Sequence, residues 1–211
     1  MHAIEILEAR LPNGNKAQAQ LVYDQDATNP REWDNLGTIL IAPDKSSWVA
    51  SPDAVVDASI PLGNNPYEHW ENLRREQLQL KKSDIALTHP INKYEHGSIS
   101  LSLSLGYNSG CDYGTVGFTY ITKETLRKAY GVKRITKNIL ERAEQCLQSE
   151  LDTLTNWLNG DCYGWKIIEY ALDDDGLDWE VAMLDSCWGY LDQDKALDDM
   201  KEMLSHFTQN Q

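Results

Sequence analysis

One long amphipathic helix between Thr136 and Asn159 constrains the fold more than any other segment. Apolar residues recur along it at spacings of three and four, at Ile139, Leu140, Ala143, Cys146, Leu147, Leu151, Leu154, Trp157 and Leu158. Thr136 is a suitable N-cap, and Asn159-Gly160 ends the pattern. About 23 residues that rise 1.5 Å each span about 35 Å. We therefore expect this helix to cross and cover an entire sheet.

The sheet under that helix is expected to be antiparallel. Ile99, Leu101, Leu103 and Leu105 alternate with serines, which places four apolar side chains on one face of a strand. Turn residues at Asn13-Gly14 and at 173–176 predict two hairpins, formed by 2–9 with 19–23 and by 165–172 with 177–190. Further strands are predicted at 37–42 and 116–121, and further helices at 66–80, at 123–130 and from Asp194 onward.

This order of elements predicts the fold class. Strands, then helices, then strands again are typical of α+β proteins. We expect an antiparallel sheet with a long amphipathic helix and shorter helices packed on it. A chain of 211 residues supports one good core, so a single α+β domain over 1–211 is expected. Pro43, Pro52, Pro61 and Pro66 predict a loop-rich variable insertion around 43–90.

Composition limits the class of protein. No apolar run approaches the roughly 20 residues of a membrane helix, and the first residues lack the pattern of a secretory leader, so a cytoplasmic protein is expected. The cysteines at 111, 146, 162 and 187 show no C-x-x-C spacing. We expect reduced thiols and no cofactor. A disulfide between Cys162 and Cys187 is conceivable if their strands pair, but a cytosolic setting argues against it.

Negative charge is concentrated near the C-terminus. Residues 141–211 hold 17 Asp or Glu against 4 Lys or Arg, a net charge of −13 out of −14 for the chain. A field of this kind favours a basic partner, and rows of carboxylates compete with nucleic acid, whose duplex carries one charge per about 1.7 Å. The alternative is a solvated acidic face without a partner. The candidate partner-binding residues are Asp173, Asp174, Asp175, Asp178, Glu180, Asp192, Asp194, Asp198, Asp199 and Glu202.

Two weaker patterns suggest other functions. Cys111 with His96, or a metal held by His96, Asp112, Asp161 and Asp185, would make the chain a small hydrolase. A basic cluster with Tyr130 among it would instead contact RNA, DNA, an acidic protein or the acidic tract of a second copy, or would only be a solvated helix face. That cluster consists of Lys123, Arg127, Lys128, Lys133, Arg134, Lys137 and Arg142.

Five short motifs in order along the chain resemble a known family. They are Pro-Arg-Glu-Trp-Asp-Asn-Leu-Gly-Thr at 30–38, Tyr-Glu-His-Gly-Ser-Ile at 94–99, Cys-Asp-Tyr-Gly-Thr-Val-Gly-Phe at 111–118, Gly-Asp-Cys-Tyr-Gly-Trp at 160–165 and Asp-Ser-Cys-Trp-Gly-Tyr at 185–190. Together they resemble a family of small uncharacterised proteins carried by bacteriophages, plasmids and other mobile elements. The resemblance covers about residues 29–192. Tyr113 and Tyr190 depart from its usual residues, and the segment 41–88 differs most.

The resemblance implies an origin and a class of function, without a reaction. Small acidic proteins of mobile elements often resemble inhibitors of host defence. We therefore expect a non-enzymatic anti-defence protein, of the anti-CRISPR or antirestriction kind, in the host bacterial cytoplasm. Its expected partner is a basic nucleic-acid-binding surface of a host protein or nucleoprotein complex. Direct binding to nucleic acid and to membranes is not expected, and a homodimer or self-associating scaffold stays open as an alternative.

Overall fold

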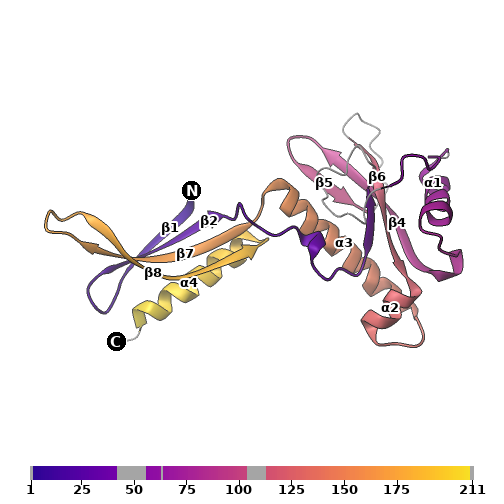
Figure 1. Ribbon diagram of the computed structural model, residues 1–211. Coiled ribbons are helices and arrows are strands. Elements are labelled where there is room, and N and C mark those ends of the chain that lie inside the picture. The colour runs from indigo at the N-terminus through magenta and orange to yellow at the C-terminus, as the bar shows by residue number, and fades with distance from the viewer. Residues whose placement is uncertain (1, 42–55, 63, 104–112, 210–211) are drawn as a thin grey trace. The chain divides into compact units, whose positions relative to one another are not determined.

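The computed structural model describes residues 2–41, 56–62, 64–103 and 113–209 (Figure 1). The α+β class is confirmed, as are the two hairpins, the long helix and the C-terminal helix. The strands of the described residues form two antiparallel sheets of four strands each, where the sequence led us to expect one. Alternation within a strand specifies which side chains face the core but not which strand lies beside it, so the sequence pattern did not separate the two sheets.

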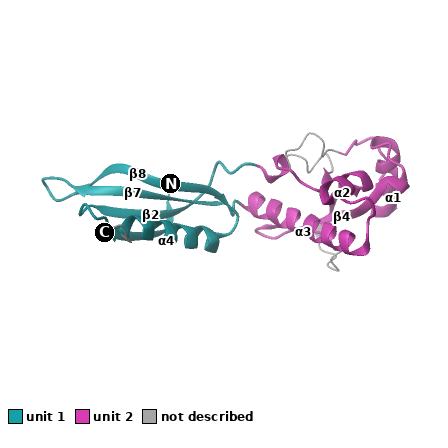
Figure 2. Ribbon diagram, turned by 90° about the horizontal axis from the view of Figure 1, so that it is seen from below, with its two compact units in different colours: residues 1–28, 160–211 teal, residues 29–159 magenta. Residues whose placement is uncertain are grey.

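The chain divides into two compact units (Figure 2). Unit 1 consists of residues 1–28 and 160–211, and unit 2 of residues 29–159. Unit 2 is therefore inserted into the sequence of unit 1, between two strands that pair with each other. The expectation of one domain over 1–211 stays a prediction, as does the variable insertion around 43–90, of which residues 42–55 and 63 lie outside the described part.

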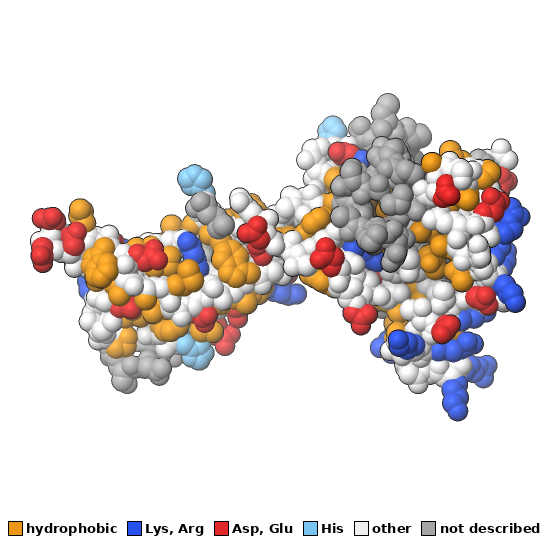
Figure 3. Space-filling model, viewed as in Figure 1, with side chains coloured by type: hydrophobic (Ala, Val, Ile, Leu, Met, Phe, Trp, Pro, Cys, Tyr) orange, Lys and Arg blue, Asp and Glu red, His pale blue; other side chains and the backbone are white. Residues whose placement is uncertain are grey.

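Charge is divided unequally between the two units. Unit 1 has 17 Asp or Glu against 5 Lys or Arg, a net charge of −12, whereas unit 2 has 16 against 14, a net charge of −2. Figure 3 shows acidic side chains at the hairpin end of unit 1 and basic side chains over the α2 end of unit 2. The acidic excess of the chain is thus almost entirely a property of unit 1.

Unit 1 is a sheet with one helix packed on it. Its strand order is β1-β2-β7-β8, with β1 at Ala3–Arg10, β2 at Lys16–Tyr23, β7 at Tyr163–Leu172 and β8 at Asp178–Tyr190. Helix α4, at Gln193–Gln209, contacts β2 and β7. Gly14 and Gly176 have positive φ in the two hairpin turns, a conformation that glycine adopts at little cost.

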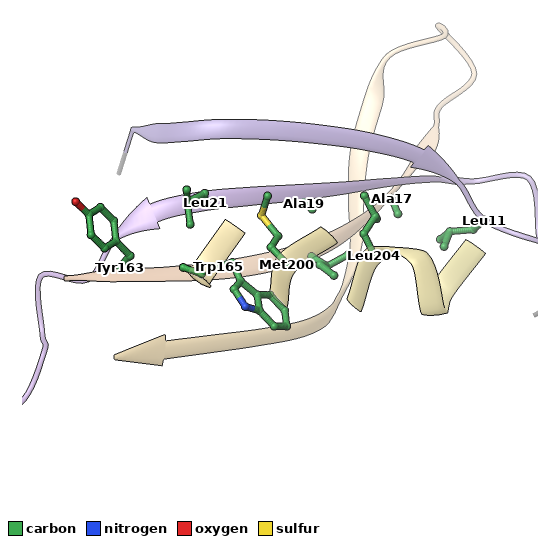
Figure 4. Packing of buried hydrophobic residues seen from close by; sticks show 10 residues of the cluster. Leu11, Ala17, Ala19, Leu21, Tyr163, Trp165, Met200 and Leu204 are labelled. Atoms are coloured by element: carbon green, nitrogen blue, oxygen red, sulfur yellow. The ribbon is translucent and has the colours of Figure 1, made fainter. Parts of the chain in front are cut away.

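The core of unit 1 lies between α4 and the middle of its sheet (Figure 4). Ala17 and Ala19 are fully buried on β2, and their small side chains leave room for Met200 of α4. Trp165 of β7 is 2% exposed and is the largest fully buried side chain of the described residues. This packing fixes α4 on the sheet and sets which of its residues face solvent.

Unit 2 has the strand order β3-β6-β4-β5. Its strands are β3 at Thr38–Ile41, β6 at Tyr113–Thr122, β4 at Ile85–Glu95 and β5 at Ile99–Ser102. Helix α3, at Lys137–Asn159, packs its buried residues Leu147, Leu151 and Leu154 into this unit's core. Polar side chains of α3 also bind the backbone of β5, for Asn159 Oδ1 accepts from Ile99 N at 2.8 Å. A helix thereby covers the edge of the sheet, which would otherwise be free to pair.

Shorter helices complete unit 2. Helix α1, at Pro66–Asn72, continues as a π-helix at Leu73–Gln77, and α2 lies at Lys123–Tyr130. Single 3-10 turns lie at Pro30–Glu32 and Lys82–Asp84. Asn65 caps α1, and Thr122 caps α2, which ends at Gly131 with φ 63°. No helix among the described residues is long and apolar enough to cross a membrane.

The 11-residue strand β4 was not predicted from the sequence. Pro90 lies within it, and proline interrupts strand patterns because it cannot donate to the ladder. The strand accommodates Pro90 opposite Phe118, with irregular register between Ile91 and Asn92. Residues 104–112, which include Leu105 and most of the glycine-rich loop, lie outside the described part.

Candidate partner-binding surface

Asp173, Asp174 and Asp175 form the turn of the β7–β8 hairpin. The Asp173 carboxylate Oδ1 accepts from Asp175 N at 3.0 Å and from Leu177 N at 2.8 Å. Gly176 N also donates to Asp173 O at 3.0 Å. Asp173 therefore holds the turn together, as aspartate does in hairpin turns. Asp174 and Asp175 are exposed, and their carboxylates make no hydrogen bond or ion pair with the described residues.

Asp178 and Glu180 also differ in whether their carboxylates have a partner within unit 1. Asp178 forms an ion pair with Lys16 of β2, which is also 3.4 Å from Glu8 Oε1. The hydrogen bond to Asp178 is the main cause of the raised pKa of Lys16. These residues line an open hollow of about 650 Å³ that also includes Arg10 and Tyr170. Glu180 lies opposite Tyr170, is exposed and has no partner among the described residues.

The candidate acids of α4 also divide into two groups. Asp192 caps the helix, for its Oδ1 accepts from Asp194 N at 3.0 Å and from Lys195 N at 3.2 Å. Asp194, Asp198 and Glu202 are exposed and follow one another at intervals of four residues. Each interval rises about 6 Å along the helix, so these three carboxylates form a single row on one face.

Asp199 belongs to the interior of unit 1. Its Oδ2 accepts from Trp165 Nε1 at 2.8 Å and also from the hydroxyl of Tyr190. Burial, and then the hydrogen bond to Asp199, raises the pKa of Tyr190. Of the ten candidate acids, Asp173, Asp178, Asp192 and Asp199 are thus engaged inside unit 1. The carboxylates of the other six, Asp174, Asp175, Glu180, Asp194, Asp198 and Glu202, have no hydrogen bond or ion pair among the described residues.

Large apolar side chains accompany the free acids of the hairpin, and the sequence analysis missed them. On β8, Trp179 is 52% exposed, Val181 41% and Met183 56%. Leu172 and Leu177 flank the turn and are also exposed. The sequence shows the alternation Asp-Trp-Glu-Val at 178–181, which predicts a strand but does not show whether its apolar side chains are covered. We call Asp174, Asp175 and Glu180 together with Trp179, Val181 and Met183 the hairpin surface.

The outer edge of β8 is open along this surface. β8 is the last strand of its sheet, and residues 178–183 are all exposed. Within the described part of the chain, no hydrogen bond from outside the sheet reaches the backbone of 178–184. Further along, Asp185 Oδ1 accepts from Ser186 N and Asp24 Oδ2 from Gly189 N, so side chains occupy that stretch. The free edge coincides with the acidic and apolar side chains.

The residues of the two hydrolase hypotheses are distributed over both units and the part of the chain that is not described. His96 lies in the turn between β4 and β5 of unit 2, whereas Asp161 and Asp185 belong to unit 1. Cys111 and Asp112 lie outside the described residues. Among the residues that are described, no group of three or more His, Cys, Asp or Glu side chains could hold a metal ion.

The described cysteines have the properties of structural thiols. Cys146, Cys162 and Cys187 are free, and the strand register places Cys187 opposite Trp165 instead of Cys162. Burial raises the pKa of the Cys146 and Cys162 thiols, and nearby carboxylates raise it further. A raised pKa keeps a thiol protonated and unreactive.

Comparison with known proteins gives no match, for no family model, no curated protein and no solved structure matches this chain.

Proposed function

We propose that this chain is a non-enzymatic accessory protein of a mobile element, which inhibits a host defence system by binding one of its proteins. The observation that carries the proposal is the hairpin surface, where the free carboxylates of Asp174 and Asp175 in the turn and of Glu180 on β8 lie near exposed Trp179, Val181 and Met183 along an open strand edge. Tryptophan is enriched at the centres of protein interfaces. Carboxylates around it select a basic partner and steer its approach.

The partner we propose is the basic surface with which a host protein, such as a CRISPR effector or a restriction enzyme, holds nucleic acid. The resemblance to proteins of mobile elements supports this class of partner. The charge of unit 1 supports the sign of the partner's surface, because a net charge of −12 attracts a positively charged groove over several ångströms. Two copies of the chain would repel each other at this hairpin, so a homodimer through it is disfavoured.

The spacing of the exposed carboxylates on α4 argues that this protein does not mimic the charge pattern of a DNA duplex. Asp194, Asp198 and Glu202 place one carboxylate every 6 Å or so, whereas a duplex has a charge every 1.7 Å or so. The row on α4 is therefore much sparser than DNA. We infer that the apolar side chains of β8 supply much of the affinity and that the acids determine which partner binds.

A competition assay tests the proposal. Purified guide-loaded CRISPR effectors and restriction endonucleases are mixed with labelled target DNA, and the DNA that stays bound is measured as this protein is added. The triple variant Asp174→Lys, Asp175→Lys, Glu180→Lys should lose the displacement of DNA. Trp179→Ala should weaken it by about 30-fold, the equivalent of about 2 kcal/mol for an interface tryptophan.

A matched control reverses three exposed acids away from the hairpin. Asp26→Lys, Glu32→Lys, Asp34→Lys changes the net charge by the same amount, and it should leave the displacement within about twofold of wild type. Equal loss in both triple variants would mean that net charge alone acts. A wild-type protein that displaces no DNA from any of these enzymes would contradict the proposal.

A further inference from the structure

Unit 2 carries a segregated positive surface that the hairpin does not explain. Residues 122–142 hold 7 Lys or Arg against 2 Glu, in a chain whose net charge is −14. This segment comprises α2, the turn that follows it and the first turns of α3. The remainder of unit 2 has 7 Lys or Arg against 14 Asp or Glu. Positive charge is therefore collected on one part of an otherwise acidic unit.

The fold brings these cations together. Gly131 ends α2 in the left-handed conformation, and Val132 N donates to Arg127 O at 3.0 Å, so α3 begins within a few residues of the end of α2. The guanidinium of Arg142 lies over the ring of Tyr130, 5.0 Å from its centroid. That contact joins the second turn of α3 to the last residue of α2.

Buried residues hold the surface in a fixed shape. Leu126 of α2 is fully buried, and it packs in one cluster with Ile139 and Ala143 of α3 and with Ile121 of β6. Arg127 and Lys128 on α2, Lys133 and Arg134 in the turn, and Lys137 and Arg142 on α3 are all exposed. A ligand would therefore meet them without first having to order the backbone.

Most of these cations are not neutralised by carboxylates. Lys137 is 3.4 Å from Glu141. Among the described residues no carboxylate pairs with the side chains of Arg127, Lys128, Lys133, Arg134 or Arg142, which we call the cationic surface. The first turn of α3 also contains no acid, so the partial positive charge of a 23-residue helix adds to the field.

We propose that the cationic surface binds the phosphate backbone of nucleic acid. The net charge of the chain led us to expect no such contact, but charges farther away than about 8 Å are largely screened at physiological ionic strength, so the local surface decides. Binding to the acidic unit of a second copy is the other candidate. Such a contact, whether it pairs two copies reciprocally, closes a ring or forms a filament, would appear as self-association of the protein alone.

The predicted signature is a steep dependence on salt. Five phosphate contacts give a slope of about −4.5 for log Kobs against log salt with duplex DNA, and about −3.5 with a single strand. Affinity for a duplex should then fall about 500-fold between 50 and 200 mM salt. The ratio of the two affinities at one salt concentration shows which form of nucleic acid the surface prefers.

The experiment measures fluorescence anisotropy of labelled 20-nucleotide single strands and 20-base-pair duplexes with the full chain. Arg127→Gln, Lys133→Gln, Arg134→Gln should lower the magnitude of the duplex slope by about 2.7, or 0.9 for each cation removed. The matched control Arg75→Gln, Lys81→Gln, Lys82→Gln removes the same charge from exposed positions elsewhere in unit 2. It should keep the wild-type slope.

Three outcomes would overturn the inference. One is the absence of binding at 50 mM salt, and another is a slope that the cationic variant shares with wild type or with the control. The third is concentration-dependent association of the protein alone, seen by sedimentation and removed by the cationic variant, which would assign the surface to a second copy. The residues of the cationic surface all belong to unit 2, so failure here would leave the hairpin proposal untouched.

Discussion

The indole Nε1 of Trp165 donates to the carboxylate of Asp199 at 2.8 Å and joins the middle of the unit 1 sheet to α4. The same carboxylate accepts from the Tyr190 hydroxyl on β8. An acid that the sequence assigns to the solvent face thus links three elements of the fold. The Asp199 carboxylate therefore holds together β7, β8 and α4, the elements that carry the exposed acids.

Replacing Asp199 should therefore destabilise the protein. Asp199→Ala leaves the Trp165 N–H without its partner in a largely buried place, so we expect a loss of about 1 to 3 kcal/mol in the free energy of unfolding. Its neighbour Asp198 is exposed and has no ion pair within the described part of the chain, and Asp198→Ala should change stability by less than about 0.5 kcal/mol. Urea unfolding followed by tryptophan fluorescence measures both. Equal effects of the two changes would contradict the role of Asp199.

Tyr190 should give stability a dependence on alkaline pH. Because its pKa is raised in the folded state, the folded protein keeps a proton that the unfolded chain releases. The stabilisation is present below a pH of about 10 and is lost as the pH rises toward the folded-state pKa. The free energy of unfolding of wild type should fall more steeply between about pH 9 and about pH 11 than that of Tyr190→Phe. Parallel curves for the two proteins would show that Tyr190 titrates as it does in the unfolded chain.

Removing one partner of a buried ion pair should destabilise unit 2. Arg31 Nη1 is 3.4 Å from Glu150 Oε2, with side chains 7% and 12% exposed. Glu150 Oε1 also accepts from Leu36 N at 2.6 Å, and Arg31 Nη2 donates to Gly37 O at 2.6 Å. Glu150→Ala leaves a buried cation unpaired, so we expect a loss of about 3 to 5 kcal/mol.

The exposed pair Lys137 and Glu141 on the same helix is the control for this change. Glu141→Ala should cost about 0.5 kcal/mol or less, as expected of a solvated pair four residues apart. Chemical denaturation followed by circular dichroism compares the two variants. A Glu150→Ala protein as stable as Glu141→Ala would mean that the buried pair contributes little.

Two glycines of β6 should respond in opposite ways to alanine. A Cβ at Gly117 would lie 2.0 Å from Leu40 O on the paired strand, whereas a Cβ at Gly114 would meet nothing within 4 Å. Gly117→Ala must push β3 away and should cost about 2 kcal/mol or more. Gly114→Ala should be neutral or stabilise by about 0.5 kcal/mol, because it restricts the unfolded chain. Thermal unfolding midpoints measure the difference, and a lower midpoint for Gly114→Ala than for Gly117→Ala would refute it.

The sequence predicted the elements whose signals are local. Apolar spacing along 136–159 predicted α3, and Thr122 with Gly131 predicted both ends of α2. Signals that depend on tertiary neighbours were missed. Pro90 concealed β4 because a proline within a run argues against a strand. Nothing in a run of acids distinguishes Asp199, which meets Trp165 only after α4 packs on the sheet.

The hairpin surface was partly predictable for the same reason. The turn at 173–176 and its acids follow from residue type, and both are present as expected. The exposure of Trp179 and Met183 depends on β8 being the last strand of a sheet whose helix contacts other strands most. An apolar residue alternating with acids has the same pattern in a covered strand and in an open one.

Phage plating efficiency on a host with an active defence system tests the central claim most directly. Wild-type protein expressed in that host should raise plating, whereas the hairpin variant Asp174→Lys, Asp175→Lys, Glu180→Lys should give the plating of a host without the protein. The control Asp26→Lys, Glu32→Lys, Asp34→Lys, expressed to the same level, should plate like wild type. A hairpin variant that protects phage as well as wild type does would contradict the claim that this surface binds the defence protein.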